Sequence, residues 1–306
     1  MKKISIFFAM FWLLTVTAFS QEEGATASKE NKNKSLLGYF MAHDSRPEPL
    51  MFANGRTIDN QTCVINPAKS LEFIIQHRFG TMDNGISDLW GVFGAANTRL
   101  GLNYSITDWV QLEFGTTKNY KIQDFGLKVN LLQQSRDKKI PVSVTYYGNM
   151  AIDARAEKTF GADYKFIDRL SYFNEAIVTR KFTNWFTLSV GGSFTHFNKM
   201  DTLKEHDKIA LHFVGRFKLT EQSSIILDYD WPLVINGIKE WPGDIQDPPK
   251  PNFGIAWEIA TVTHTFQIVL GTSTLMVPQY NVMYNQNDFT KGDIFLGFNI
   301  TRMWSF

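Results

Sequence analysis

The stretch "TRLGLNYSITDWVQLEFGT", residues 98–116, decides the fold class of this chain. Large apolar residues take every second position from Leu100 to Ile106 and again from Val110 to Phe114, and polar or small residues fill the positions between them. A period of two is the signature of a β-strand with one apolar face and one polar face. The two halves are joined by Thr-Asp-Trp, and Asp is favoured in tight turns. The stretch therefore predicts a β-hairpin.

The same alternation recurs along most of the chain. From position 70 onward the apolar segments have period two and are separated by polar or Gly- and Pro-containing connections. None of them is an unbroken apolar run of the length that a membrane-spanning helix needs. The pattern predicts about twelve strands, at residues 70–79, 98–106, 110–116, 125–131, 140–148, 169–181, 186–194, 208–218, 224–231, 252–260, 264–272 and 293–306.

The connections between these strands alternate in length. Tight turns such as Thr107-Asp108-Trp109 and Thr183-Asn184-Trp185 alternate with longer segments, least clearly between residues 119 and 136. This asymmetry is typical of outer-membrane barrels, which have short periplasmic turns, longer extracellular loops and an even number of strands. We therefore predict an all-β fold, a transmembrane antiparallel β-barrel of about 12 strands. A soluble two-sheet sandwich is the alternative, because alternation alone does not say what the apolar face contacts.

The N-terminal part predicts export. Two lysines, a short apolar stretch and a small-x-small cleavage site indicate a signal peptide over residues 1–20, with a retained anchor as the alternative. The charged segment 21–35 is expected to be disordered. Residues 36–68 lack periodicity and are expected to form an irregular periplasmic lead-in or a plug. Residues 69–306 are expected to form the barrel, in the outer membrane of a Gram-negative bacterium.

The composition fits a protein that is apolar on one strand face only. Aromatic residues make up 14% of the chain, yet the mean hydropathy is −0.18, as expected where lipid-facing and lumen-facing residues alternate. Loss of residues 1–20 removes two lysines and no acid, so the net charge falls from +1 to −1 and gives no reason to expect nucleic-acid binding. Cys63 is the only cysteine, so no disulfide, haem attachment or paired-cysteine metal site is predicted. We expect no cofactor and no metal.

The final segment, "DIFLGFNITRMWSF" at residues 293–306, alternates up to its last residue. Because closing a barrel pairs the last strand with the first, we expect this segment to belong to the wall. A terminal aromatic residue is also the usual feature that barrel-assembly machinery reads. Aromatic residues near the turns predict a girdle at the membrane–water interface on the periplasmic side. Aromatic packing on a soluble core is the plainer alternative. The predicted girdle consists of Tyr104, Trp109, Trp185, Trp304 and Phe306.

Several ordered blocks of the sequence resemble a known family. They include "LEFIIQHRFG", "NTRLGLNYSITDW", "YKIQDFGLKVNLLQQ", "IPVSVTYYG", "RLSYFNEAIVTRKF" and "GDIFLGFNITRMWSF". Together these blocks, which extend over most of residues 56–306, resemble an uncharacterised Bacteroidota outer-membrane β-barrel family, a domain of unknown function. The resemblance implies fold and location, and it implies no activity and no catalytic or ligand residues. Where the family has a polar or basic residue after the turn aspartate, this chain has Trp109.

The polar positions of the predicted strands, which alternate with the apolar ones, carry charges of both signs. Mixed charges suit salt bridges across a narrow interior or a weakly selective water path, whereas a strongly selective pore would show rings of one sign. The predicted lumen-lining residues are Glu72, Arg78, Arg99, Glu113, Lys128, His212, Arg216, Lys218, Asp228, Asp230 and Glu258.

Three classes of function fit this pattern. The polar inward face favours a small passive channel or transporter for a small polar solute. A non-transporting barrel in a larger outer-membrane assembly, with partners bound through the long loops, is the alternative. A membrane-embedded hydrolase is the third class and the least favoured, so we predict no enzyme.

The hydrolase hypothesis needs a nucleophile, a base and an orienting group within hydrogen-bond reach. None of the candidates lies in a recognised motif. Asp228 and Asp230 share a face and offer ligands for a divalent cation, although two such aspartates are more often simply solvated. The candidate pairs are Ser193 with His196, Thr265 with His264, and Ser45 with His43 and Asp44.

Overall fold

The computed structural model describes residues 45–200, 204–235 and 248–306. The predicted signal peptide (1–20), the segment 21–35 and the candidates His43 and Asp44 lie outside the described residues. The chain divides into two compact units. The smaller one contains residues 134–141, in which Ser135 N donates to Ile140 O at 3.0 Å.

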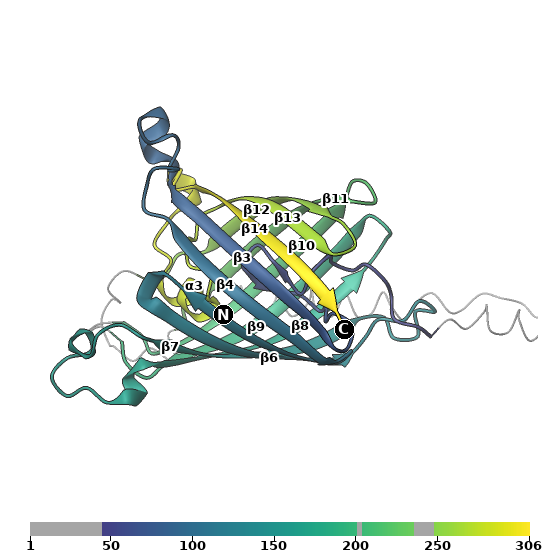
Figure 1. The fold of residues 1–306 in the computed structure, drawn as a ribbon, viewed down its shortest axis with the longest axis horizontal. Helices are drawn as coiled ribbons and strands as arrows, with labels where there is room; N and C mark the ends of the chain where they lie inside the picture. The colour runs from purple at the N-terminus through teal and green to yellow at the C-terminus, as the bar shows by residue number, and fades with distance from the viewer. Residues whose placement is uncertain (1–44, 201–203, 236–247) are drawn as a thin grey trace, which may run out of the picture. The chain divides into compact units, whose positions relative to one another are not determined.

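The larger unit is a closed barrel of twelve antiparallel strands (Figure 1). Each strand pairs with its neighbours in the sequence and β14 pairs with β3, so none of these twelve strands has a free edge. This arrangement confirms the predicted fold class. The strands are β3 (Ser70–Thr81), β4 (Asn97–Thr107), β5 (Val110–Thr117), β6 (Ile122–Leu132), β7 (Ser143–Asp153), β8 (Leu170–Lys181), β9 (Phe186–Phe197), β10 (Asp207–Lys218), β11 (Ser223–Pro232), β12 (Asn252–Ala260), β13 (His264–Gly271) and β14 (Phe295–Ser305).

The barrel closes at its last strand. Trp304 of β14 pairs with Leu71 of β3. Beyond the strand, Phe306 N donates to Lys69 O at 3.3 Å. The final residues therefore belong to the wall, as their alternation predicts.

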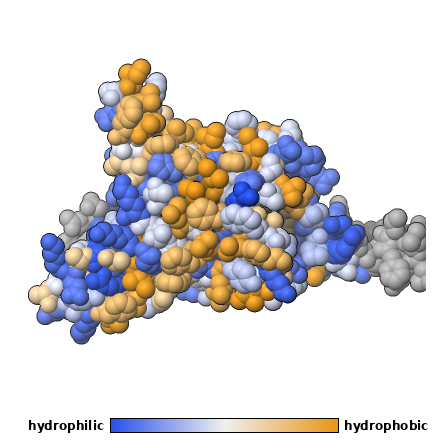
Figure 2. Space-filling model, viewed as in Figure 1, coloured by the Kyte–Doolittle hydropathy of each residue, from blue (hydrophilic) through white to orange (hydrophobic). Residues whose placement is uncertain are grey.

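Alternation gives every strand an inner and an outer face. In β4, Leu102 is 43% exposed on the outside, whereas the next residue, Asn103, is 2% exposed on the inside. Figure 2 shows apolar residues spread over the outer surface of the strands that face the viewer. So large an exposed apolar surface is unfavourable in water and suits the hydrocarbon of a membrane. No helix in the described ranges is long and apolar enough to span a bilayer.

The two ends of the barrel differ in their connections. One end has short turns, at residues 108–109, 182–185, 219–222 and 261–263. The other end, which we call the mouth, carries the long loops 82–96, 154–169 and 272–294, the shorter link 118–121, and the described parts of two further connections, residues 198–200 with 204–206 and 233–235 with 248–251. In Figure 1 the C-terminus lies at the end opposite α3 and the long loops.

A small hairpin lies inside the barrel. Its strands are β1 (Arg56–Thr57) and β2 (Asn60–Gln61), which pair antiparallel. Residues 51–63 are buried, except for half-buried Ala53, and we call them the plug segment. They hydrogen-bond to inward-facing side chains on opposite parts of the wall, for example Glu113 of β5 and Asp228 of β11. Residues 51–63 of the predicted lead-in or plug region therefore reach the interior.

A helix fills the interior at the mouth. It is α3 (Pro278–Tyr284), within the 272–294 loop, and it contacts β8, β9, β10 and β11. Val282 of α3 packs with Phe173 and Ala210 on the inner wall. The remaining helical elements within the described residues are short 3₁₀ segments, η1 (Met82–Asp88), η2 (Asn119–Lys121), η3 (Glu157–Phe160), η4 (Phe166–Arg169) and η6 (Phe289–Lys291).

Candidate functional site: the barrel interior and its mouth

The inward-facing positions of the strands place charged side chains in the interior of the barrel. Lys218 lies at the end of β10, where its Nζ donates to the exposed Glu221 at 2.8 Å, so it reaches the rim rather than the interior. The other ten residues predicted to line the lumen are all buried, namely Glu72, Arg78, Arg99, Glu113, Lys128, His212, Arg216, Asp228, Asp230 and Glu258.

Ion pairs cross the inner wall. Arg99 on β4 binds Asp124 on β6 through two contacts, Nε–Oδ1 at 3.0 Å and Nη2–Oδ2 at 2.6 Å. The pair passes over Gly115 of β5, and a side chain there would collide with both partners. A second pair, Arg216 Nε with Glu258 Oε1 at 3.3 Å, spans β11 in the same way. The wall is therefore cross-linked between strands that are not neighbours.

Ion pairs also hold the plug segment to the wall. Asp59 Oδ1 lies 2.8 Å from Arg78 Nη2 of β3, and Arg56 Nη2 lies 3.5 Å from Glu113 Oε2 of β5. Burial raises the pKa of the Asp59 carboxyl, and the charge of Arg78 opposes this shift. The plug thus carries one charge of each sign, and each faces an opposite charge on the wall.

The turn of the plug hairpin has a strained backbone that the wall stabilises. Ile58 has φ of +47°, a left-handed conformation that is unfavourable for a β-branched residue. Its carbonyl accepts from Gln76 Nε2 at 2.9 Å, Arg78 Nη2 at 3.1 Å and Asn299 Nδ2 at 2.9 Å. Its N–H donates to Gln267 Oε1 at 3.1 Å. Such strain persists where the surroundings determine the conformation, as these four hydrogen bonds do.

The paired aspartates of β11 bind protein side chains. Asn60 Nδ2 of the plug donates to Asp228 Oδ1 and to Asp230 Oδ1, each at 2.5 Å. Asn281 Nδ2 of α3 donates to Asp230 Oδ2 at 2.7 Å. The two carboxylates therefore join the plug and α3 to the wall, and an amide group occupies the place of the hypothesised cation. In the part of the chain that the structure describes, no group of three or more His, Cys, Asp or Glu side chains is arranged to hold a metal ion.

The hypothesised pairing of Ser193 with His196 is wrong, because residues three apart on a strand lie on opposite faces. Ser193 Oγ instead lies 2.7 Å from His212 Nε2, and His212 Nδ1 lies 2.7 Å from Asp230 Oδ1. Ser193, His212 and Asp230 are thus arranged in the order of a nucleophile, a base and an orienting acid. However, Ser193 is only 5% exposed, and the Phe173 ring packs edge-on against His212 at 5.9 Å. These hydrogen bonds join β9, β10 and β11. No substrate reaches the three side chains in this conformation.

The other hydrolase pairs are not assembled either. Thr265 Oγ1 points inward and donates to Asn54 Oδ1 at 3.0 Å. His264, on the opposite face, contacts Thr263 Oγ1 at 3.0 Å. Ser45 is exposed, and its two proposed partners lie outside the described residues.

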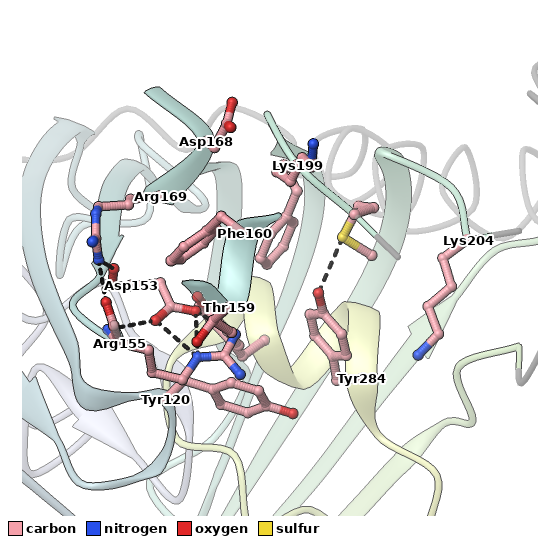
Figure 3. A pocket seen from close by; sticks show the side chains of 13 residues that line it. Tyr120, Asp153, Arg155, Thr159, Phe160, Asp168, Arg169, Lys199, Lys204 and Tyr284 are labelled. Atoms are coloured by element: carbon pink, nitrogen blue, oxygen red, sulfur yellow. Dashed lines mark hydrogen bonds and ion pairs between the residues drawn. The ribbon is translucent and has the colours of Figure 1, made fainter. Parts of the chain in front are cut away.

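A cavity of about 210 Å³ lies at the mouth (Figure 3). Tyr120, Tyr280 and Tyr284 form its floor, with ring centroids 5.1 Å apart for Tyr120–Tyr280 and 5.6 Å apart for Tyr280–Tyr284. Burial raises the pKa of the Tyr280 hydroxyl, so this ring stays neutral. Four basic side chains and two acidic ones line the cavity as well, Arg155, Arg169, Lys199 and Lys204 with Asp153 and Asp168.

Several interior residues were missed in the sequence. Asp124 lies two residues before Gly126 and therefore on the same face of the strand. Starting the predicted strand 125–131 three residues earlier would have included it. Glu175 lies in the least regular predicted strand, where the inward positions also hold Phe173 and Ile177, and the polar–apolar alternation fails. The charged residues of the plug segment have no periodic context, so no sequence signal placed them.

Solved structures of other barrels are similar to this chain only at low identity. A KdgM porin is 6% identical with a TM-score of 0.45, and the match covers 78% of this chain and 99% of that chain. A NanC porin is 8% identical with a TM-score of 0.47, with 77% and 99% covered. LpxR from Salmonella typhimurium is 12% identical with a TM-score of 0.36, with 78% and 100% covered. Similarities this low support no conclusion about function.

Among curated proteins, no sequence matches this chain. The sequence profile described as "Membrane bound beta barrel domain (DUF5777)" matches residues 52–304, which is most of the chain. The outward apolar face and the closed ring of strands agree with that description. The chain belongs to this family of membrane-bound β-barrel domains.

Proposed function

We propose that this protein is an outer-membrane channel for a small polar solute, and that the plug segment closes the channel in the conformation described above. The observation that supports the proposal is the chemistry of the contact between plug and wall. Its hydrogen bonds and ion pairs join polar groups that water satisfies equally well once the two surfaces separate. A barrel that is filled for structural reasons alone is more simply filled with apolar side chains.

Barrel size supports the same proposal. Eight strands enclose a space that their own side chains fill, whereas 16–18 strands leave an aqueous channel. Twelve strands lie between these cases, and here the plug segment and α3 occupy the remaining space. Displacing the plug segment together with α3 would expose a path lined by charges of both signs, which suits weak rather than strong ion selectivity.

One part of the plug contact is apolar. Met51, Phe52 and Cys63 pack with Val214 and Ile226 of the wall. This patch favours the seated plug through burial of apolar surface. The channel is therefore closed at rest, and opening requires a signal or a solute that offsets the lost burial.

Export and orientation complete the proposal. Residues 1–20 act as the signal peptide, the short turns face the periplasm and the mouth faces outward. Tyr104, Trp109, Trp185, Trp304 and Phe306 form the aromatic girdle at the periplasmic interface, and all five are exposed at or near the short-turn end of the barrel. Barrel-assembly machinery recognises the last strand, and the long loops are available to outer-membrane partners.

Planar-bilayer recordings test the channel. The full chain is expected to be closed most of the time, and a variant with residues 51–63 replaced by a Gly/Ser linker of the same length is expected to conduct in discrete steps. The milder Arg56→Ala/Asp59→Ala variant removes both plug charges and should open more often than the full chain. Lys158→Ala, an exposed loop lysine, is the matched control and should behave as the full chain does.

Heat-modifiable migration shows that each variant is folded before it is recorded. A folded barrel that lacks both the plug segment and α3 and still carries no current would contradict the channel and support the structural, non-transporting alternative. Hydrolysis of phospholipid by the folded protein, lost in Ser193→Ala, would instead support the enzyme.

A further inference from the structure

The cavity at the mouth is separate from the plug contact and has its own chemistry. Arg155 is one of its cations and is held by an ion pair and an aromatic ring. Its Nε and Nη2 bind Asp153, with Nη2–Oδ2 at 2.6 Å, and its guanidinium lies 4.6 Å from the centre of the Tyr120 ring. The backbone carbonyl of Arg155 accepts from Arg169 Nη1 at 2.6 Å, which also fixes the loop. A cation held this firmly loses little entropy when it binds a ligand.

One edge of this guanidinium has no partner. Arg155 Nη1 makes no hydrogen bond to any described residue, although Nε and Nη2 are both used. Arg155 lines this cavity and also a second, adjoining one. The hydrogen bond to Asp153 raises the pKa of Arg155, so the group keeps its charge. Its unused N–H groups are thus available to an acceptor at the junction of the two cavities.

The charge around the cavity is positive. Lys199 lines it and has no hydrogen bond or ion pair with any residue that the structure describes. Lys204 Nζ lies 5.2 Å from the centre of the Tyr284 ring. The Asp153 carboxylate is taken by Arg155, and Asp168 Oδ2 accepts from Lys165 N in the loop. In Figure 3 Arg155 and Tyr120 lie on one side of the cavity, and Lys199 and Lys204 lie toward the other.

The adjoining cavity has a different lining. It measures about 480 Å³ and shares Tyr120, Arg155 and Tyr284 with the first. Amide side chains dominate the rest of its wall, and the Asn119 side chain makes no hydrogen bond within the described residues. Asn285 Nδ2 and Asn287 Nδ2 already donate to backbone carbonyls. The Asn119 amide both donates and accepts, so it matches the hydroxyl groups of a sugar. The amide side chains that line it are Asn119, Asn285, Gln286 and Asn287.

We propose that these two cavities form a binding site for a small acidic sugar, with the carboxylate on Arg155 and Lys199 and the hydroxyl groups against the amide-lined side. The aromatic floor offers ring edges and faces to the C–H groups of the sugar. Ligand pockets measure roughly 300–1,000 Å³. The cationic cavity alone is smaller than this, whereas the two adjoining cavities together lie within the range and suit a small sugar. The proposal names a solute class for the channel proposed above, but the binding site does not depend on conduction.

Binding to the full chain in detergent tests the site, with D-glucuronate as the probe and isothermal titration calorimetry as the measurement. We expect saturable binding of D-glucuronate and none of D-glucose, which lacks the carboxylate. Lys199→Gln should weaken binding about fivefold, as expected for one exposed charge contact. Arg155→Gln should weaken it about tenfold or more, because a charge-assisted contact is lost. Lys158→Gln, on the same loop but outside both cavities, should bind as the full chain does.

Three results would overturn the proposal. The first is no binding of D-glucuronate by the folded full chain. The second is equal binding of glucose and glucuronate, or an equal effect of Lys199→Gln and Lys158→Gln. The third is sulfate binding as tightly as glucuronate, which would leave a simple anion site without sugar recognition. Binding without conductance would contradict only the channel, and conductance without binding would contradict only this site.

Discussion

The outer and inner faces of the same strands are built by different rules. The outer face consists mainly of apolar side chains at every second position, and apolar contact does not require one particular partner. The inner face depends on individual pairs, such as Arg99 with Asp124, that join strands that are not neighbours. The comparison teaches that a pattern is enough to form the wall, whereas the state of the interior depends on single contacts. Substitutions on the two faces should therefore differ in kind as well as in size.

The largest effect is expected from breaking an inner ion pair. Arg99→Ala leaves Asp124 buried without its partner, and such losses cost about 3–5 kcal/mol. Urea titration of the protein in lipid vesicles, followed by tryptophan fluorescence, measures the change in the free energy of unfolding. The double variant Arg99→Met/Asp124→Leu should recover most of the loss. A single variant no less stable than the double would show that the two groups are not buried together.

A charge on the outer face is expected to lower the free energy of unfolding by the next largest amount. The loss should depend on how deep in the bilayer the charge lies. Leu102 lies in the middle of β4, so Leu102→Arg should cost roughly 2–4 kcal/mol at the centre of the bilayer. Ile106→Arg, near the short-turn end of the same strand, should cost about 0–1 kcal/mol. The same titration compares them. Equal costs at both positions would mean that this face does not meet lipid and would favour a soluble protein.

A plug contact should matter less than either of these. Asn60→Ala removes the amide that bridges Asp228 and Asp230, and unsatisfied buried acceptors cost about 1–3 kcal/mol. Asn84→Ala, on an exposed loop, is the matched control and should change the free energy of unfolding by less than about 0.5 kcal/mol. If the two variants lose the same stability, Asn60 does not hold the plug.

The smallest effect is expected at the rim. Lys218→Ala should leave the stability unchanged, because its partner Glu221 is exposed. Arg216→Ala, two residues earlier on the same strand, should be clearly destabilised, because Glu258 would stay buried without a partner. Comparable losses in the two variants would place Lys218 in the interior after all.

The wall was predictable from the sequence because its information is local. Except for β8, the least regular one, the strands follow from period-two segments such as residues 98–106 and 110–116, and the observed boundaries differ from the predicted ones by a few residues. Ser143, where β7 begins, lies three residues after the predicted start at Ile140. A single strand shows which face is apolar, so the exposed and buried sets followed as well.

The interior was predictable only in part. Parity placed Arg99 and Glu113 inside, but nothing local says that Arg99 would pair across β5 or that Glu113 would meet Arg56 of the plug. The mouth cavity was not predicted, because Tyr120, Arg155 and Tyr280 come from three separate connections. Contacts of this kind depend on how the closed ring brings distant segments together, and one sequence without its fold does not contain that distance information.

The reactivity of Cys63 tests the seated plug most directly. Cys63 is the only cysteine, it lies in the plug segment, and burial raises the pKa of its thiol to about 11. In the folded full chain at pH 8, a maleimide should leave Cys63 almost unmodified over a time in which the urea-unfolded chain is fully labelled. The Arg56→Ala/Asp59→Ala variant should be labelled at an intermediate rate. Labelling of the folded full chain as fast as the unfolded chain would contradict a plug held inside the barrel.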